Sequence, residues 1–374
     1  MRRDPGTCRR DHGLIADTAP LDNPLTSGIH ELLETVDPLR YAGWDSLLER
    51  HPEGSVFHSS AWARILAETY GYAPRYLLKR SSGGISILFP VMEVNSRLTG
   101  RRGVALPFSD YCDPIFSDVE SFKNAWNHLV SEAGNAKWKS VELRCRGKLP
   151  ETFESSSTFF HHLLELEGGE DVLFRRLRGS TQRNIRKSEK EGVTVSISGS
   201  EDSVAEFYRL NCMTRRDHGL PPQPMSFFRN LHEHILKKDA GFIALAHFRG
   251  TCIAANVYLL FGDRAYYKYG ASDRKSQHLR ANNLLMWEAI RSCARRGFRS
   301  LCFGRTETEN EGLRQFKNGW GAQEGLLRYY KYDLLAKGFV ISGPAVSGWH
   351  NKVFRNLPIP LSRAIGTVFY RHMA

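Results

Sequence analysis

The stretch that decides the fold is AYYKYGASDRKSQHLRANNLLMWEAIRSCARRGFRSLCF, residues 265–303. It begins as an apolar, aromatic strand at Ala265–Tyr269, which runs into small residues and a basic loop. Apolar residues then recur at helical spacing over Asn283–Arg295, and a short strand, Ser300–Phe303, comes next. A strand, a helix and a second strand in this order predict a crossover unit of an α/β protein.

The first half of the chain repeats this order. A helix over Phe122–Ala133 leads into a strand at Ser140–Arg144, and in both halves a glycine-turned hairpin of apolar strands precedes the helix. Chance similarity of two αβ units is one explanation, and a tandem of two copies of one domain is the other. The predicted fold class is α/β, an α+β arrangement with mixed sheets, in two tandem domains.

Composition narrows the class of protein. The 374 residues are 41% hydrophobic and 25% charged, which excludes a disordered, collagen-like or membrane-spanning chain. Lys and Arg outnumber Asp and Glu by 52 to 40, and this surplus of +12 indicates anionic partners. The seven cysteines form no CxxC pair, and no signal peptide is apparent, so we expect a cytoplasmic protein.

The pattern along the chain suggests four segments. Residues 1–35 lack periodicity and are expected to form a disordered leader. The first domain is expected over 36–165 and the second over 166–335. Residues 336–374 form a C-terminal segment that mixes aromatic, aliphatic and basic residues, and it is expected to pack on the first domain or to lie on a membrane surface.

Three constellations are candidates for binding or chemistry. Arg183, Arg186 and Lys187 share one face of a predicted helix, which is either a solvated face or an anion site. Between the strand and the helix of residues 265–303, a loop with Arg280 and Asn282 reaches a helix start, where backbone N–H groups can meet a pyrophosphate. The third constellation, residues 303–322, places Arg305 at a strand end and Lys317 among apolar neighbours.

Several familiar chemistries are not supported by the sequence. It has no HExxH, GxSxG or GxxxxGK[ST] motif and no regularly spaced set of metal ligands, so we expect no metal site. The loop before the helix also lacks the glycines of a nucleotide-binding fingerprint.

Taken together, the motifs resemble the FemAB-type branch of the GNAT acyltransferase superfamily, whose members carry two tandem GNAT-like acyl-CoA N-acyltransferase domains. The resemblance spans roughly residues 40–335 and rests on RNIRKSEKEGV (183–193), YKYGASD (267–273), LRANNLLMWEAI (279–290), FGRT (303–306) and FKNGWGA (316–322). PFSDYCDPI (107–115) resembles the loop that lines the acceptor groove in the first domain. The tail NLPIPLSRAIGTVFYR (356–371) is similar to that of the subgroup found with exosortase and PEP-CTERM exopolysaccharide systems.

The resemblance implies transfer of an acyl or aminoacyl group to an amine on a cell-envelope or exopolysaccharide precursor. The donor would be acyl-CoA or aminoacyl-tRNA, with no tightly bound cofactor, and the acceptor an envelope glycan or a lipid-linked precursor. The chain lacks the long charged helical-hairpin insertion of some cell-wall enzymes. Its Arg280-Ala281-Asn282 departs from the usual glycine-containing pyrophosphate loop.

On this basis each candidate residue has a hypothetical role. Lys317 and Arg305 would stabilise the oxyanion formed when an amine attacks the donor. The residues expected at the donor are Arg280, Asn282 and Tyr269. Those expected at the acceptor or another anion are Arg183, Arg186, Lys187, Asp110 and Tyr111.

Two other classes of function stay open from the sequence. One is a non-catalytic GNAT-fold protein that recognises an anionic polymer, a lipid head group or tRNA. The other is an RNA-binding module, although the interleaved aromatic residues of a base-stacking surface are missing. The sequence also leaves open a peripheral contact of residues 345–374 with the inner membrane.

Overall fold

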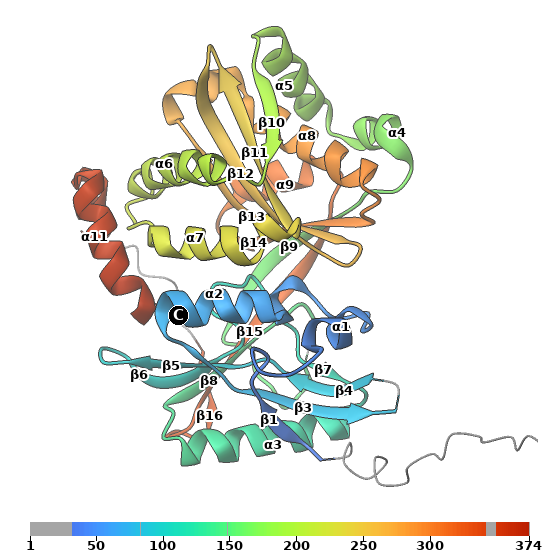
Figure 1. Cartoon of the computed structure of the whole chain (residues 1–374), viewed down its shortest axis with the longest axis vertical. Helices are drawn as coiled ribbons and strands as arrows, with labels where there is room; N and C mark the ends of the chain where they lie inside the picture. The colour runs from blue at the N-terminus through green and yellow to red at the C-terminus, as the bar shows by residue number, and fades with distance from the viewer. Residues whose placement is uncertain (1–31, 83, 148, 342–348, 374) are drawn as a thin grey trace, which may run out of the picture.

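The computed structural model describes residues 32–82, 84–147, 149–341 and 349–373. Its strands form two sheets, and helices cover their faces (Figure 1). The small sheet has the order β1 (Glu34–Val36), β3 (Tyr76–Ser81), β4 (Gly84–Phe89) and β7 (Ile115–Phe116).

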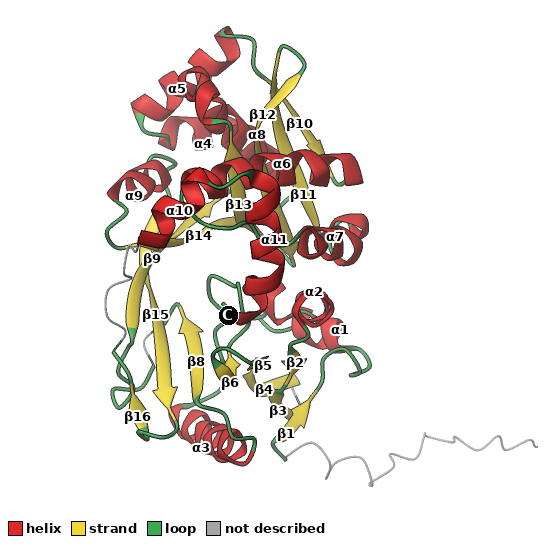
Figure 2. Cartoon of the chain, turned by 90° about the vertical axis from the view of Figure 1, so that its left-hand side faces the viewer, coloured by secondary structure: helices red, strands yellow, loops and turns green. Residues whose placement is uncertain are grey.

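The large sheet runs through both halves of the molecule (Figure 2). Its order is β10 (Thr194–Ser198), β11 (Gly241–Phe248), β12 (Thr251–Phe261), β13 (Arg264–Ser272), β14 (Ser300–Glu307), β9 (Ser157–Glu165), β15 (Gln323–Asp333), β8 (Ser140–Cys145), β6 (Gly100–Val104), β5 (Met92–Ser96) and β2 (Ala73–Pro74), with β16 (Gly338–Phe339) on β15. The α-helices are α1 (Trp44–Glu49), α2 (Ser60–Tyr70), α3 (Val119–Asn135), α4 (Gly169–Arg176), α5 (Gly179–Lys190), α6 (Glu201–Asp217), α7 (Met225–His234), α8 (Ala281–Arg295), α9 (Glu311–Asn318), α10 (Trp349–Asn356) and α11 (Ile359–Phe369).

Two crossover units give the halves their similarity. In the second half α8 joins the parallel strands β13 and β14, which pair from Arg264 opposite Ser300 to Tyr266 opposite Cys302. In the first half α3 joins the parallel strands β6 and β8, which pair at Gly103 opposite Val141 and Val104 opposite Glu142. This repeated strand–helix–strand order confirms the predicted α/β class with mixed sheets.

Local sequence explains how these elements begin and turn. Asp118 caps α3, because its Oδ1 accepts a hydrogen bond of 2.8 Å from the Ser121 backbone N–H. Arg249 and Gly250 both have positive φ, 49° and 78°, which makes the two-residue turn that the twist of the β11–β12 hairpin favours.

The helices divide between the two faces of the sheet. On one face, α8 packs on β11 and β12 and carries Leu284, Leu285 and Trp287 into the core. On the other face, α6 and α7 lie between the second-half strands and α2 of the first half. Trp62 of α2 meets Phe227 of α7 edge to face, with ring centroids 6.0 Å apart, so the two halves share an apolar core.

Strands of the two sheets lie at or across the expected segment boundaries. Residues 1–31 of the expected leader lie outside the described residues, but Glu34 and Thr35 pair with β3, so they belong to the fold and not to a leader. The large sheet continues across both expected boundaries, since β15 pairs with β9 on one side and β8 on the other. The domain limits at 165 and 335 therefore stay predictions.

The C-terminal segment packs on both halves of the molecule. The sequence had suggested that it packs on the first domain or lies on a membrane. Helices α10 and α11 lie against α6 of the second half. The short η4 helix (Tyr370–His372) reaches β5 of the first half. Within the described ranges, no helix is long and apolar enough to span a bilayer.

Candidate active site

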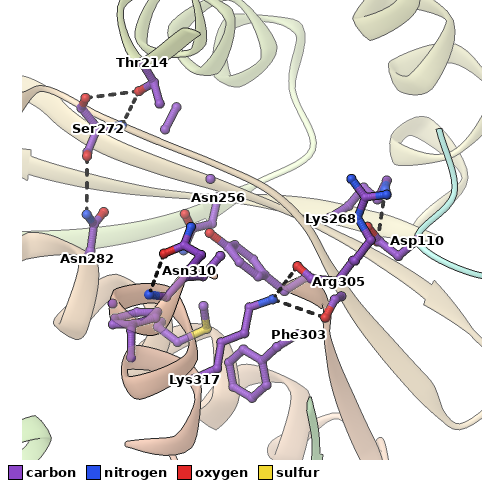
Figure 3. Close-up of a pocket in the computed structure, with 18 of the residues that line it drawn as sticks. Asp110, Thr214, Asn256, Lys268, Ser272, Asn282, Phe303, Arg305, Asn310 and Lys317 are labelled. Atoms are coloured by element: carbon purple, nitrogen blue, oxygen red, sulfur yellow. Dashed lines mark hydrogen bonds and ion pairs between the residues drawn. The ribbon is translucent and has the colours of Figure 1, made fainter. Parts of the chain in front are cut away.

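A cavity of about 610 Å³ opens where β13 and β14 separate (Figure 3). The parallel pairing of the two strands ends at Tyr266 and Cys302, and the next residues of both strands line the cavity. Its walls are Asp110, Thr214, His218, Asn256, Tyr267, Lys268, Gly270, Ala271, Ser272, Asn282, Met286, Phe303, Gly304, Arg305, Asn310, Gly312, Leu313, Phe316 and Lys317. We call this space the main cavity.

Irregularities in both strands direct side chains into the main cavity. The pairing of β12 with β13 passes from Val257–Tyr269 to Tyr258–Tyr267, which leaves Lys268 as an extra residue. The pairing of β14 with β9 shifts between Cys302 and Arg305, where Gly304 has a φ of 69°. Bulges of this kind re-aim side chains and end regular pairing, so they explain why the strands part here.

Lys317 is the most deeply buried cation of the cavity wall. Only 2% of it is exposed, and its Nζ donates to the carbonyl oxygens of Gly304 at 3.1 Å and Arg305 at 2.9 Å. Burial lowers the pKa of Lys317 to about 8, although the Asp110 carboxylate opposes this shift. An ammonium has three N–H groups, so two carbonyl partners leave one for a ligand in the cavity.

Arg305 is held in place by partners on β14 and β15. Its Nη1 donates to the Tyr329 hydroxyl at 3.2 Å, and its Nη2 lies 2.9 Å from Glu307 Oε1. The guanidinium also lies 4.4 Å from the centroid of the Phe159 ring. This planar cation is therefore oriented before any ligand arrives.

Asp110 enters the main cavity from the first half of the chain. Its Oδ2 accepts a hydrogen bond of 3.0 Å from Lys268 Nζ. Burial acts to raise the pKa of Asp110, but the Lys268 ammonium and the nearby Arg305 and Lys317 outweigh it and hold that pKa below its usual value. The cavity wall thus carries three cations around one carboxylate.

A second cavity adjoins the main one at the start of α8. It is lined by Ile253, Ala254, Ser272, Asp273, Ser276, Gln277, Arg280, Ala281, Asn282, Asn283 and Phe316, and it shares Ser272, Asn282 and Phe316 with the main cavity. Arg280 has a φ of 57° and forms the boundary between η3 (Arg274–Leu279) and α8. Asn282 Nδ2 donates to Ser272 Oγ at 3.3 Å, which ties the helix start to the end of β13.

The predicted site residues fall into three places. Lys317, Arg305, Asp110, Arg280 and Asn282 line the two adjoining cavities. Arg183, Arg186 and Lys187 line a separate depression on α5, which lies at one end of the molecule (Figure 1).

Tyr269 and Tyr111 do not line either cavity. Tyr269 packs edge to face on Phe227 and Phe228, and Tyr111 is buried with the Arg146 guanidinium 4.5 Å from its ring centroid. Both rings lie in or against the core between the halves, so their predicted substrate contacts stay predictions.

Sequence reasoning did not single out Lys268. Its side chain is 5% exposed, and its Nζ lies 5.4 Å from the centroid of the Phe57 ring and 5.2 Å from that of Tyr269. The signal was a lone lysine inside the aromatic run YYKY, since a buried lysine needs an anionic partner. In the described part of the chain, no group of three or more His, Cys, Asp or Glu residues could hold a metal ion.

Comparisons with known proteins agree with this architecture. Residues 175–322 match the family model of the acetyltransferase (GNAT) domain. The crystal structure of FemX aligns with a TM-score of 0.60 at 14% identity, covering 76% of this chain and 94% of FemX. A tandem GNAT protein from the clavulanic acid biosynthesis pathway aligns with a TM-score of 0.53 at 10% identity, covering 84% of this chain and 100% of that one.

No match was found among curated protein sequences. The matched domain contains the splayed strands, α8 and Lys317, and the two structural alignments extend over both halves. Residues 175–322 therefore match a GNAT domain, and the chain has the fold of tandem GNAT proteins over most of its length.

Proposed function

We propose that this protein is an N-acyltransferase that moves an acyl or aminoacyl group to an amine on a cell-envelope or exopolysaccharide precursor. The observation that carries the proposal is the main cavity, which opens between the splayed strands of the GNAT domain and contains the buried Lys317. Site and family thus point to the same reaction class.

Acyl-CoA is the donor that the two adjoining cavities suit best. Its pyrophosphate would lie at the start of α8, beside Arg280 and Asn282 and the positive end of the helix dipole. Its acyl thioester would extend into the main cavity, past the apolar side chains of Met286, Leu313 and Phe316. Aminoacyl-tRNA is the alternative donor, and the basic face of α5 supports it.

The transfer itself needs charge stabilisation more than a strong base. The acceptor nitrogen attacks the donor carbonyl carbon, a C–N bond forms, and the carbonyl oxygen gains negative charge. Lys317 and Arg305 would stabilise that oxyanion, and Asp110 would orient the incoming amine. The C–S bond then breaks, or the C–O bond of an aminoacyl ester, and the proton lost by the nitrogen passes to the leaving group.

A structural neighbour and the C-terminal tail suggest the acceptor and the location. FemX is one of the structural neighbours, and the tail at residues 356–371 resembles that of exopolysaccharide-associated proteins, so we propose an envelope glycan or a lipid-linked precursor. We place the protein in the cytoplasm, with a peripheral contact at the inner membrane through residues 345–374.

The decisive experiment is mass spectrometry of the ligand that co-purifies with the full chain, followed by a transfer assay with the donor so identified. A CoA ester or a charged tRNA, together with an acylated amine product, is the expected result. Filter binding over a salt series separates the donors, because affinity for tRNA falls much more steeply with ionic strength. Binding of an anionic polymer with no acyl product from either donor class would instead establish a non-catalytic protein.

A further inference from the structure

The segment that comes after β15 differs in charge from the rest of the chain. Residues 334–374 contain no Asp or Glu, whereas they include Lys337, Lys352, Arg355, Arg363 and Arg371. Helices α10 and α11 are the structured part of this segment, and α11 lies along the outside of the molecule (Figure 1). We call residues 349–373 the C-terminal strap.

One face of the strap is fixed to the protein. Ser362, Gly366 and Tyr370 are buried at four-residue intervals, and a Cβ on Gly366 would overlap the Pro222 carbonyl. Arg215 Nη2 donates to the Tyr370 hydroxyl at 2.9 Å, and the Tyr72 hydroxyl donates to the Arg371 carbonyl at 3.0 Å. The strap therefore has a definite orientation relative to both halves.

A second face of the strap, beside the buried one, is apolar and exposed. Leu361, Val368 and Phe369 are 50%, 59% and 47% exposed, and Val353 of α10 is 45% exposed. Leu361 and Val368 lie within about 20° of each other around the axis of α11, and Phe369 lies at the edge of this face, beside buried Ser362. Burying them would remove apolar surface from water without disturbing the contacts that hold the strap.

The neighbouring β5–β6 turn continues this face. Ser96 Oγ lies 2.9 Å from His372 Nδ1, which places the turn beside η4. Leu98 in that turn is 64% exposed, next to the exposed Arg97. An apolar side chain beside a cation thus recurs at the end of the strap.

Charge decides which partner fits. Two copies of the strap facing each other would bring Lys352 and Arg355 together with their like-charged equivalents, because the strap has no acidic residue to pair with them. An apolar helix face with a basic border is instead the arrangement that enters the interface of an anionic bilayer.

We propose that the outward face of the C-terminal strap, extended by the β5–β6 turn, docks this protein on an anionic phospholipid bilayer. Asn351 of α10 packs on Gly219, next to His218 in the wall of the main cavity. Docking therefore brings the cavity close to the membrane. This last consequence rests on the proposed acyl transfer and favours the lipid-linked acceptor over a free glycan.

The test is co-sedimentation of the full chain with vesicles of phosphatidylcholine alone or mixed with phosphatidylglycerol, without donor or acceptor. We expect binding to the mixed vesicles only. Leu361→Ser/Val368→Ser/Phe369→Ser should lower partition roughly a hundredfold. Lys352→Gln/Arg355→Gln should lower it roughly 25-fold, because each cation near the surface contributes about a factor of five.

Matched variants control for apolar area and for charge. Val119→Ser/Ile197→Ser removes two exposed apolar side chains from other elements, and Arg40→Gln/Lys123→Gln removes two charges from exposed positions of the first half; both should bind as the wild type does. Unchanged melting temperatures of the strap variants would show that their folding is intact.

Three results would overturn the proposal. The first is equal binding to both vesicle types, and the second is loss of binding only in the Arg40/Lys123 variant. The third is self-association that the triple variant abolishes in the absence of vesicle binding. Turnover of a soluble amine is measured separately, so a failure of the proposed transferase function would not be mistaken for a failure of docking.

Discussion

The β6–α3–β8 and β13–α8–β14 units share one topology but differ beyond the point where their parallel pairing ends. In the second half the strands part around the main cavity. In the first half residues 105–112 continue from β6 along β8, where Ala105 N donates to the Glu142 carbonyl and Cys112 N to the Arg144 carbonyl, both within 2.9 Å. Ala105, Leu106 and Cys112 are completely buried.

This difference assigns the halves different tasks. The segment of residues 105–112, which continues along β8 where the strands of the second half part, also carries Asp110. This carboxylate pairs with Lys268 in the main cavity. Tyr329 of β15 supports the connection, because its hydroxyl donates to the Asp110 carbonyl at 2.7 Å and accepts from Arg305. In the proposed mechanism one unit supplies the reaction site, and its repeat supplies a wall of that site.

Replacing Lys317 gives the largest expected effect. Lys317→Met removes the buried ammonium that would stabilise the oxyanion, so kcat should fall by about 10²–10³, the loss typical of one such donor. Single-turnover acyl transfer measures this loss. Lys123→Met, at an exposed position on α3, should retain full activity. An unchanged rate in the Lys317 variant would contradict the proposal that acyl transfer takes place in the main cavity.

Replacing Arg144 tests the packing of residues 105–112 along β8 in the first half. Its guanidinium donates to Glu142 at 2.8 Å and to the Ser109 carbonyl at 3.2 Å. Arg144→Met leaves these acceptors without their partner, so the free energy of unfolding should fall by about 2–4 kcal/mol. Denaturant titration measures it, and Arg40→Met at an exposed ion pair should stay within about 0.5 kcal/mol of the wild type.

Arg144→Met should lower stability but reduce kcat less than Lys317→Met does. A stable but inactive Arg144→Met protein would contradict the proposal that the first half supports the site and the second half contains it.

A double-mutant cycle examines the contact between the halves. Asp110→Asn leaves the Lys268 ammonium buried without a charged partner, and Lys268→Met has the converse effect on Asp110. Each single variant should lose about tenfold in kcat/KM for the acceptor, and the double variant should show a coupling energy of about 1–2 kcal/mol. Strictly additive losses would mean that the ion pair does not connect the two halves functionally.

The sequence predicts the crossover units well, because their apolar periodicity is local. It also selects Lys317, Arg305 and Arg280, because a cation at a strand end or a helix start is visible in the order of residues. The fold class is confirmed by the repeated parallel pairing.

The remaining site features depend on geometry that no local pattern contains. Lys268 reaches the cavity through a bulge, which breaks the alternation on which strand reasoning relies. Tyr111 is adjacent to Asp110 in sequence but is buried beneath Arg146, because the segment after β6 has an irregular backbone with Phe108 at a φ of 61°. The separation of α5 from the cavity is set by tertiary packing.

The smallest expected effect is the pH dependence of kcat that Lys317 in the main cavity should cause. Burial lowers the pKa of Lys317 to about 8, so its ammonium fraction falls as the pH rises through that value. If the ammonium stabilises the oxyanion, kcat halves near pH 8 and falls about tenfold per unit well above it. The assay should use an acceptor amine whose pKa lies well below neutrality. Such an amine does not titrate in the pH range measured, so it does not contribute to the pH profile of kcat. In Lys317→Arg the charge persists at every pH measured, so the descending limb should vanish whatever rate remains; a limb that persists would belong to another group.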